Sequence, residues 1–400
     1  MPAEPTPSHR NPHSDPHSDS HSATDLRHMQ AALALAEQAI GLTEPNPRVG
    51  CVLVAQDGRV IGRGHTQQAG GPHAEVMALR EARAQPDGGA ALRGATAYVT
   101  LEPCAHHGRT PPCCDALIEA GVGRVVAALR DPNPLVAGQG RARLAAAGIA
   151  VSCGLLAEPA RELNIGFLSR MQRGRPWLRM KLAASLDGRT ALPDGTSQWI
   201  TSAPARADGH AWRRRAGALL TGSGTVLADD PRLDVRLIET PRQPLRVVLD
   251  RQLRTPPGAR ILQPPGATLI YTDAASAEST TATTLAALPG VTLQPVACGA
   301  DGRLDLAAVL ADLGRRGVNE LHVEAGQHLS GAFVQAGLVD ELLLYLAPKL
   351  LGPGLDLLQL PVLARLADAP QLCFTDLARV GPDLRLLARP LSATPDWLMD

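Results

Sequence analysis

The sequence predicts an α/β protein made of two consecutive domains. Its 400 residues exceed one typical domain, since about 150 residues per domain give two to three. Strand-like and helix-like segments alternate along almost the whole chain, which is the pattern of layered α/β sheets. A polar stretch rich in arginine, at 173–176, interrupts this alternation. We therefore expect a tail at 1–22 and domains at 23–172 and 173–400.

The tail is polar, rich in proline, serine and histidine, and without apolar periodicity, so we expect disorder and no signal peptide. An apolar stripe at helical spacing then predicts a helix, with Thr24 or Asp25 as N-cap and Gly41 as stop. In the rest of the first domain, strands are predicted at 49–55, 59–64, 96–101, 124–129 and 149–153. Helices are predicted between them at 74–84, 112–120 and 140–147. A connecting helix is predicted at 158–170.

The second domain is predicted from the same alternation. Five strands come first, at 177–184, 216–221, 245–249, 268–271 and 291–296. A helix, a strand, a helix and a strand follow at 306–316, 320–324, 329–336 and 341–347. The absence of a fixed-period repeat argues against a solenoid.

Composition narrows the classes of function. The 39 basic and 39 acidic side chains leave no net charge that would attract nucleic acid or an anionic membrane. No apolar run reaches the roughly 18 residues of a membrane-spanning helix. The seven cysteines are few for this length and do not suggest a disulfide framework, so we expect a cytoplasmic protein. Four of them are interpreted as small core residues: Cys51, Cys153, Cys298 and Cys373.

The sharpest chemical motif combines His73, Glu75, Cys104 and a cysteine at 113 or 114. One imidazole and two thiolates suit zinc, and a catalytic zinc ion keeps its fourth position for water, whose pKa falls to about 7. A glutamate two residues from the histidine is the proton carrier that base deaminases require. The motif therefore predicts a zinc-dependent deaminase.

Two alternatives remain open at this point. Spacing alone does not decide between Cys113 and Cys114, and a closed structural zinc site could use Cys114 or His106 as fourth ligand, although such a site has no use for Glu75. The eight residues between Cys104 and Cys113, in place of the usual two, include Arg109, which suits a substrate phosphate unless the loop is merely solvated.

Several stretches make the chain recognisable. They are PNPRVGCVLV (45–54), GGPHAEVMAL (70–79), YVTLEPCAHHGRTPPCCDALI (98–118), KLAASLDGRTA (181–191), TVLADDPRLDVR (225–236) and VDELLLYLAPKLLG (339–352). In these the chain closely resembles the bifunctional riboflavin-biosynthesis enzymes, which fuse a diaminohydroxyphosphoribosylaminopyrimidine deaminase to a 5-amino-6-(5-phosphoribosylamino)uracil reductase. The resemblance covers nearly everything from about Asp25 to Leu387.

The resemblance implies a cytidine-deaminase-like three-layer domain followed by a dihydrofolate-reductase-like α/β domain. It implies hydrolytic deamination of 2,5-diamino-6-(5-phosphoribosylamino)pyrimidin-4-one, and then reduction of the ribosyl group to a ribityl group. The implied cofactors are Zn²⁺ and NADPH, the partner is this small phosphorylated pyrimidine, and the implied assembly is a homo-oligomer.

The resemblance also assigns site residues. The zinc ligands are His73, Cys104 and Cys113, Glu75 is the catalytic proton carrier, and Asn46 and Arg109 contact the deaminase substrate. In the second domain the cofactor contacts are Ala183, Trp199, Thr225, Asp229, Gly326, Gln327, His328, Leu329, Ser330, Gly331 and Ala332. The substrate contacts are Ser197, Arg213, Leu233, Arg236 and Glu324.

Without the resemblance, the second domain offers weaker signals. Strand 320–324 ends in a glycine-bearing turn that opens a helix, and such an end suits a phosphate, although it is often only a turn. Arg213 and Arg236 suit the substrate's phosphate. Asp229 and Lys181 are the ionisable candidates for proton transfer, and each can equally be a structural ion pair.

Two rival functions are considered. One is a deaminase of another nucleoside or of a tRNA base with an unrelated second domain, and the balanced charge and the long spacer count against it. The other is an inactive, zinc-stabilised interaction module, against which the intact Glu75 counts.

Overall fold

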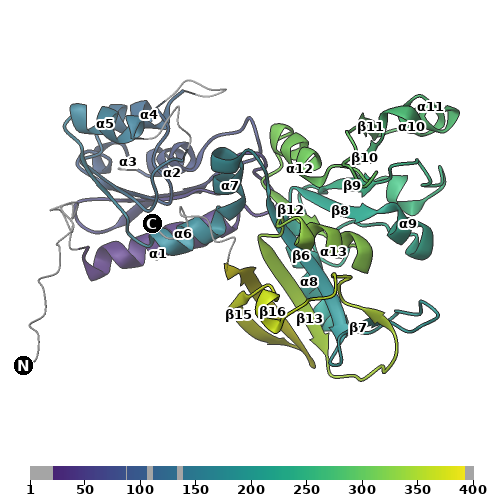
Figure 1. Ribbon diagram of the computed structural model, residues 1–400. Helices are drawn as coiled ribbons and strands as arrows, with labels where there is room; N and C mark the ends of the chain where they lie inside the picture. Colours follow the sequence, from purple (N-terminus) through teal and green to yellow (C-terminus); the bar gives the residue numbers. More distant parts are fainter. Residues whose placement is uncertain (1–20, 87, 106–110, 133–137, 392–400) are drawn as a thin grey trace, which may run out of the picture.

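The computed structural model describes residues 21–86, 88–105, 111–132 and 138–391. Within these ranges the chain forms two large sheets, one in each half, with helix α7 (Ile165–Arg173) between them (Figure 1). The predicted boundary after residue 172 falls in the last turn of α7. The two-part α/β architecture is as predicted.

The first sheet has five strands in the order β2-β1-β3-β4-β5. They are β1 (Gly50–Val54), β2 (Val60–His65), β3 (Thr96–Val99), β4 (Arg124–Ala127) and β5 (Ala150–Cys153). Strand β1 is antiparallel to β2 and β3, whereas β3, β4 and β5 are parallel. Every residue of β1 is buried, because helices α1 and α2 cover the two faces of the sheet at this interior strand.

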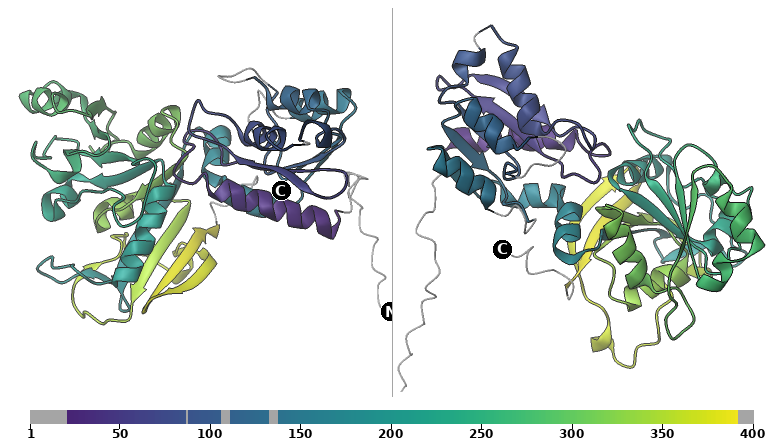
Figure 2. Two further views of the ribbon diagram at one scale, coloured as in Figure 1. Left: turned by 180° about the vertical axis from the view of Figure 1, so that it is seen from behind. Right: turned by 90° about the horizontal axis from the view of Figure 1, so that it is seen from above.

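Helices on both faces complete three layers (Figures 1 and 2). Helix α1 (Ala23–Glu37) contacts α6 (Ala157–Leu163) on one face, and α2 (Ala74–Arg83), α3 (Gly88–Ala91), α4 (Cys113–Glu119) and α5 (Gln139–Ala146) lie on the other. Helix α2 lies directly on β2, since a side chain at Gly64 would come 2.3 Å from the carbonyl oxygen of Ala74. The resulting three-layer domain is the predicted one.

Some predicted boundaries were wrong. The N-cap of α1 is Ser22 rather than Thr24 or Asp25, because Ser22 and Asp25 form a reciprocal capping box. The helix ends at Glu37, before Gly41. The single predicted connecting helix is two helices, α6 and α7, which meet at Asn164.

The second sheet has nine strands in the order β11-β10-β9-β8-β12-β6-β13-β16-β15. They are β6 (Trp177–Ser185), β8 (Ala218–Gly222), β9 (Leu245–Leu249), β10 (Thr268–Thr272), β11 (Val291–Pro295), β12 (Glu320–Val323), β13 (Glu341–Ala347), β15 (Leu372–Val380) and β16 (Asp383–Pro390). The strands from β11 to β13 are parallel, and the hairpin β15–β16 adds antiparallel strands at one edge. A separate ribbon pairs β7 (Arg189–Ala191) with β14 (Leu355–Asp356).

Helices cover this sheet on both faces, over two separate apolar clusters. They are α8 (Ala203–Arg215), α9 (Ser223–Asp229), α10 (Ala274–Ala277), α11 (Thr280–Ala286), α12 (Leu306–Arg315) and α13 (Gln327–Gln335), with short 3-10 turns at Arg260–Leu262 and Leu366–Asp368. Sequence reasoning missed α8, which buries only Ala205 and His210, and the hairpin β15–β16, whose outer strand is largely exposed. Both lack the apolar periodicity from which elements are predicted.

None of the helices in the described part of the chain is long and apolar enough to cross a membrane. The cysteine interpretation was partly wrong. Cys51 is buried and Cys153 half-buried, but Cys298 and Cys373 are exposed and are not core residues.

Candidate active site

The three predicted zinc ligands come together in the first domain. His73 is the N-cap of α2, Cys104 lies in the loop after β3, and Cys113 is the first residue of α4. The Nδ1 atom of His73 lies 3.7 Å from Sγ of Cys104 and 3.3 Å from Sγ of Cys113. The donor atoms of the three residues all lie within 4.8 Å of one another, a group of one nitrogen and two sulfurs that fits a tetrahedral zinc ion.

The positions of their thiols separate the neighbours Cys113 and Cys114 as possible ligands. A hydrogen bond with Cys113 lowers the pKa of the Cys104 thiol to about 4, and the same interaction raises the pKa of Cys113. Cys114 points elsewhere, since its buried thiol donates to the carbonyl oxygens of Pro103 and Gly140 at 3.1 and 3.6 Å. The geometry therefore favours Cys113 over Cys114 as a ligand. His106, the other alternative, lies outside the described residues.

Glu75 lies in the first turn of α2, beside this group, and only 4% of its surface is exposed. Burial, reinforced by the nearby Cys104, raises the pKa of its carboxyl group to about 7. A carboxyl group with such a pKa can both accept and donate a proton near neutral pH.

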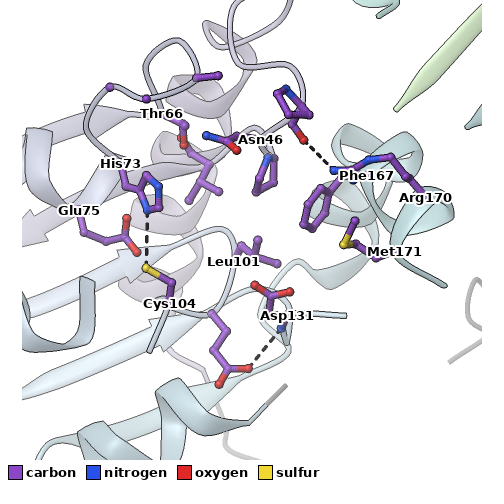
Figure 3. Close-up of a pocket in the computed structure, with 17 residues that line it drawn as sticks. Asn46, Thr66, His73, Glu75, Leu101, Cys104, Asp131, Phe167, Arg170 and Met171 are labelled. Atoms are coloured by element: carbon purple, nitrogen blue, oxygen red, sulfur yellow. Dashed lines mark hydrogen bonds between the residues drawn. The ribbon is translucent and has the colours of Figure 1, made fainter. Parts of the chain in front are cut away.

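A cavity of about 450 Å³ opens in front of the ligands (Figure 3). Its wall includes Asn46 and Thr66 on one side and His73, Glu75 and Cys104 on another. This volume is in the range of small-molecule sites. Asn46, which the resemblance assigns to the substrate, lines this cavity, whereas Arg109 lies outside the described residues.

Sequence reasoning missed the opposite wall. Phe167, Arg170 and Met171, on one face of α7, close the cavity, together with Asp131 (Figure 3). Glu102 also lines the cavity. Its carboxylate accepts hydrogen bonds from the backbone N–H groups of Asp131, at 3.2 Å, and of Gly138 and Arg141, and so holds these residues in place. These residues of α7 lie in the stretch LNIGFLSRM (163–171), yet no spacing rule connects them to a metal motif far away in the chain.

A second cavity, of about 1310 Å³, lies in the second domain near the carboxyl ends of β6, β8, β9 and β12. This edge is where ligands bind in open α/β sheets. The predicted residues in its wall are Ala183, Ser197, Thr225, Asp229, Glu324, Gly326, Gln327, His328, Leu329 and Ala332. Helix α13 begins at this cavity with Gly326 as N-cap and without a side-chain cap.

Among the described residues, the wall of this second cavity does not include six of the predicted ones: Trp199, Arg213, Leu233, Arg236, Ser330 and Gly331. Trp199 is 59% exposed and is covered by the Arg206 guanidinium, 4.4 Å from the ring centre. Ser330 is buried and donates to the carbonyl oxygen of Ala325 at 3.2 Å. The first turns of α13 thus present one face to the cavity and the other to the core.

Charged side chains gather at the end of β12. Arg213 donates to both carboxylate oxygens of Glu324, at 2.5 and 2.9 Å, and Nζ of Lys181 lies 3.8 Å from Glu324. Burial would raise the pKa of Glu324, but Arg213 and Lys181 hold it well below its ordinary value. Burial lowers the pKa of Lys181 and raises that of Asp229. Both shifts bring the pKa values of these groups closer to neutral pH, as a group that transfers protons requires.

The fold and the first site define a zinc-dependent base deaminase, and the second domain adds a separate large cavity at a sheet edge. Residues 22–129 match the family model of the cytidine and deoxycytidylate deaminase zinc-binding region. Residues 176–386 match the RibD C-terminal domain. The chain belongs to the RibD family, the bifunctional deaminases and reductases of riboflavin biosynthesis.

Similar proteins support this assignment along almost the whole chain. The riboflavin biosynthesis protein RibD of Escherichia coli (strain K12) is 50% identical over an alignment of 378 residues, which covers 90% of this chain and 98% of that protein. The structure of Acinetobacter baumannii RibD (form 1) has a TM-score of 0.82 and 41% identity, covering 92% of this chain and 99% of that one.

The structure of a diaminohydroxyphosphoribosylaminopyrimidine deaminase/5-amino-6-(5-phosphoribosylamino)uracil reductase from Thermotoga maritima has a TM-score of 0.81 and 35% identity, with coverages of 92% and 99%. The rival with an unrelated second domain is therefore wrong, and so is the inactive interaction module, because both halves match one bifunctional family.

Proposed function

We propose that the first domain deaminates 2,5-diamino-6-(5-phosphoribosylamino)pyrimidin-4-one, the kind of substrate in the name of the Thermotoga maritima relative. The observation that carries this proposal is that the buried Glu75 lines one cavity with His73 and Cys104, two members of the group of three metal donors that Cys113 completes. His73, Cys104 and Cys113 would hold a zinc ion, which when bound supplies Lewis-acid activation of water.

In this reaction water replaces an amino group, and the products are a ring carbonyl and ammonia. Glu75 takes a proton from the attacking water and passes it to the ring nitrogen. It then takes the second proton and delivers it to the departing amine. Asn46, which lines the cavity, would orient the ring. Arg109 is the proposed contact to the substrate's phosphate.

The second domain would bind NADPH along α13. The free backbone N–H groups at the start of this nine-residue helix suit the cofactor's pyrophosphate. No protein atom lies closer than 4.0 Å to the position of a side chain on Gly326, so a ligand can approach the backbone there. NADPH when bound supplies a hydride. The further cofactor contacts would be Ala183, Trp199, Thr225 and Asp229, with the rest of the segment 326–332.

The substrate of the second step would be the ring-opened ribosylamine, which is an imine. Its carbon gains the hydride and its nitrogen gains a proton, so NADPH is oxidised to NADP⁺ and a ribitylamine forms. We assign the proton to Asp229, which lines the cavity and whose pKa burial raises. Lys181 is the alternative donor. The substrate contacts would be Ser197, Arg213, Leu233, Arg236 and Glu324.

We further propose that the enzyme acts in the cytoplasm, since the cysteines of the described residues are all free. We also propose that its two domains comprise residues 23–172 and 173–400.

We propose that the enzyme is a homo-oligomer that pairs through strand β15. This edge strand exposes Leu372, Phe374 and Leu377, and Phe374 is 68% exposed. An edge strand has unpaired backbone groups, and a second copy of the same edge is a self-complementary partner. Phe374→Glu should shift the sedimentation coefficient to that of a monomer, whereas an unchanged coefficient would remove this surface from consideration.

Mass spectrometry of the zinc-loaded protein tests the two activities. With the diaminopyrimidinone substrate alone, the product should show an NH group replaced by oxygen. With NADPH added, it should gain two further hydrogen atoms. Loss of the second change alone would contradict the NADPH assignment, and loss of both would contradict the proposed substrate.

A further inference from the structure

A residue of the second domain holds two residues in the wall of the deaminase cavity. Asn319, the residue before β12, is buried and belongs to the reductase half of the chain. It contacts Glu44 and Pro45 of the first domain, and Arg170 of α7. Pro45 and Arg170 line the deaminase cavity.

These contacts close a ring of hydrogen bonds. The Asn319 side-chain amide donates to the carbonyl oxygen of Pro45 at 3.0 Å, and its oxygen accepts from Nε of Arg170 at 2.6 Å. Arg170 donates through its second terminal nitrogen to the same carbonyl oxygen at 3.0 Å (Figure 3). One side chain of the reductase domain thus joins two walls of the deaminase cavity. The Asn319 backbone N–H also donates to the Glu44 carboxylate at 2.5 Å.

The next residue anchors the same segment. Glu320 is 1% exposed and accepts from Arg48 at 2.6 Å, from Arg179 at 2.7 Å and from Arg215 at 2.8 Å. Arg48 follows the Pro45–Pro47 turn, and its backbone exchanges two hydrogen bonds with the side chain of Asn164. This buried carboxylate joins Arg48 of the first domain to Arg179 and Arg215 of the second. It therefore fixes the position of the two domains relative to each other at this point.

The two halves touch closely here. A side chain on Gly166 of α7 would lie 2.4 Å from Cγ of Glu320 and 2.6 Å from the carbonyl oxygen of Asn319. Asn46, the proposed substrate contact, sits between the residues held on either side, Pro45 and Arg48. A small displacement of such a substrate contact is expected to slow the reaction, because misplacement by about 1 Å can lower the rate about 10²-fold.

We propose that Asn319 is a positioning residue of the deaminase site, supplied by the reductase domain. It holds the segment 44–49 against α7, so that Asn46 meets the pyrimidine substrate in the correct place. The fusion of the two domains then serves the deaminase geometry itself. This inference rests on the proposed deaminase role of the cavity.

Asn319→Ala in the full-length, zinc-loaded protein tests the proposal. The deaminase kcat/KM should fall about 10- to 100-fold, mainly through a higher KM. The reductase kcat/KM, measured on the separately supplied deaminated substrate, should stay unchanged, and so should the zinc content. Asn319→Ser carries the same expectation should the alanine variant not fold, because its shorter polar side chain cannot bridge Pro45 and Arg170.

Glu162→Gln is the matched control. Glu162 of α6 accepts from Arg389 of β16 at 2.8 and 2.6 Å, so it also joins the two halves, but it lines neither cavity. This variant should keep both activities. An equal deaminase loss in Glu162→Gln would show that domain contact in general matters, and would overturn the specific role of Asn319. An unchanged deaminase KM in Asn319→Ala, or an equal loss of both activities, would also overturn it.

Amide hydrogen exchange separates this inference from the proposed function. The peptide covering 44–54 should exchange faster in Asn319→Ala than in the parent protein or in Glu162→Gln. Unchanged exchange would refute the positioning role even if the parent protein deaminates the substrate. Faster exchange in a protein that does not deaminate it would support the positioning role while refuting the proposed substrate.

Discussion

The two cavities differ in what supplies their chemistry. At the deaminase cavity of about 450 Å³, three metal donors lie within 4.8 Å of one another, and two of them line the cavity together with a buried glutamate. The reductase cavity is about 1310 Å³, and its wall is drawn from several strand ends and from the backbone at the start of α13. Where side chains themselves bind the metal and transfer protons, the sequence contains a distinct motif. Where a bound cofactor reacts, the protein contributes many individually weak contacts, which leave no such motif in the sequence.

This comparison predicts unequal sensitivity to substitution. In the deaminase cavity a single substitution, of a metal ligand or of Glu75, should remove most of the activity. In the reductase cavity single changes should have graded effects. The parent protein's other activity provides an internal control in each case.

The largest effect is expected for Cys113→Ser. Losing one of three protein ligands should remove zinc and abolish deamination, while the reductase activity persists. Zinc content by elemental analysis and both activities are measured. Cys114→Ser is the matched control, because its hydroxyl can replace the thiol as donor to Pro103, and it should retain zinc. Zinc loss in the Cys114 variant alone would reverse the ligand assignment.

Glu75→Gln is expected to be nearly as damaging but by another route. The side chain keeps its size and loses its proton-carrying group, so the deaminase kcat should fall about 10²- to 10⁴-fold with zinc retained. Steady-state kinetics and zinc analysis on the same sample check this. A variant that keeps more than a tenth of the parent kcat would mean that another group carries the proton.

A moderate effect is expected in the reductase cavity for Gly326→Ala. The added methyl group would meet only Oγ1 of Thr225, at an ordinary contact distance of 4.0 Å, so the melting temperature should stay the same. A cofactor close to the backbone would be displaced, and the KM for NADPH should rise about tenfold, the equivalent of one lost hydrogen bond. An unchanged KM would place the pyrophosphate elsewhere. Deamination without NADPH should not respond at all.

The same contrast explains what could be predicted from the sequence. His73, Glu75 and Cys104 are recognisable because their chemistry needs those residue types at that spacing. The choice between Cys113 and Cys114 came from family resemblance, because it depends on how the first turn of α4 directs two adjacent thiols. Continuous apolar runs marked the buried strands, such as β1.

The rest depends on long-range packing. Arg170 and Asn319 become neighbours only when α7 docks on the second domain, so no local pattern marks them. Trp199 is a predicted cofactor contact through the family resemblance alone, and the contact of its ring with Arg206 is one that no local pattern marks. Helix α8 was missed because it is polar almost all round, with only Ala205 and His210 buried.

The smallest effect is expected for Asp25→Asn, which changes the framework of the first domain and neither cavity. The buried carboxylate of Asp25 accepts from Tyr98 at 2.7 Å and from Arg124 at 2.8 Å. Burial alone would raise its pKa, but the hydrogen bonds from Arg124, Tyr98 and Ser22 hold it well below the ordinary value. The variant should lower the free energy of unfolding by about 1–3 kcal/mol at pH 7 and leave zinc and kcat unchanged.

The pH dependence identifies the carboxylate as the cause. Because the folded pKa of Asp25 lies below the unfolded value of about 3.9, its stabilisation is complete above that pH and is lost as the pH falls towards the folded pKa. The difference between parent and variant in chemical denaturation should therefore shrink below about pH 4. Asp57→Asn removes an exposed ion pair with Arg59 and should change stability far less. A difference that persisted unchanged in acid would assign the loss to packing, and a parallel fall in kcat would mean that the deaminase site depends on its framework as much as on its ligands.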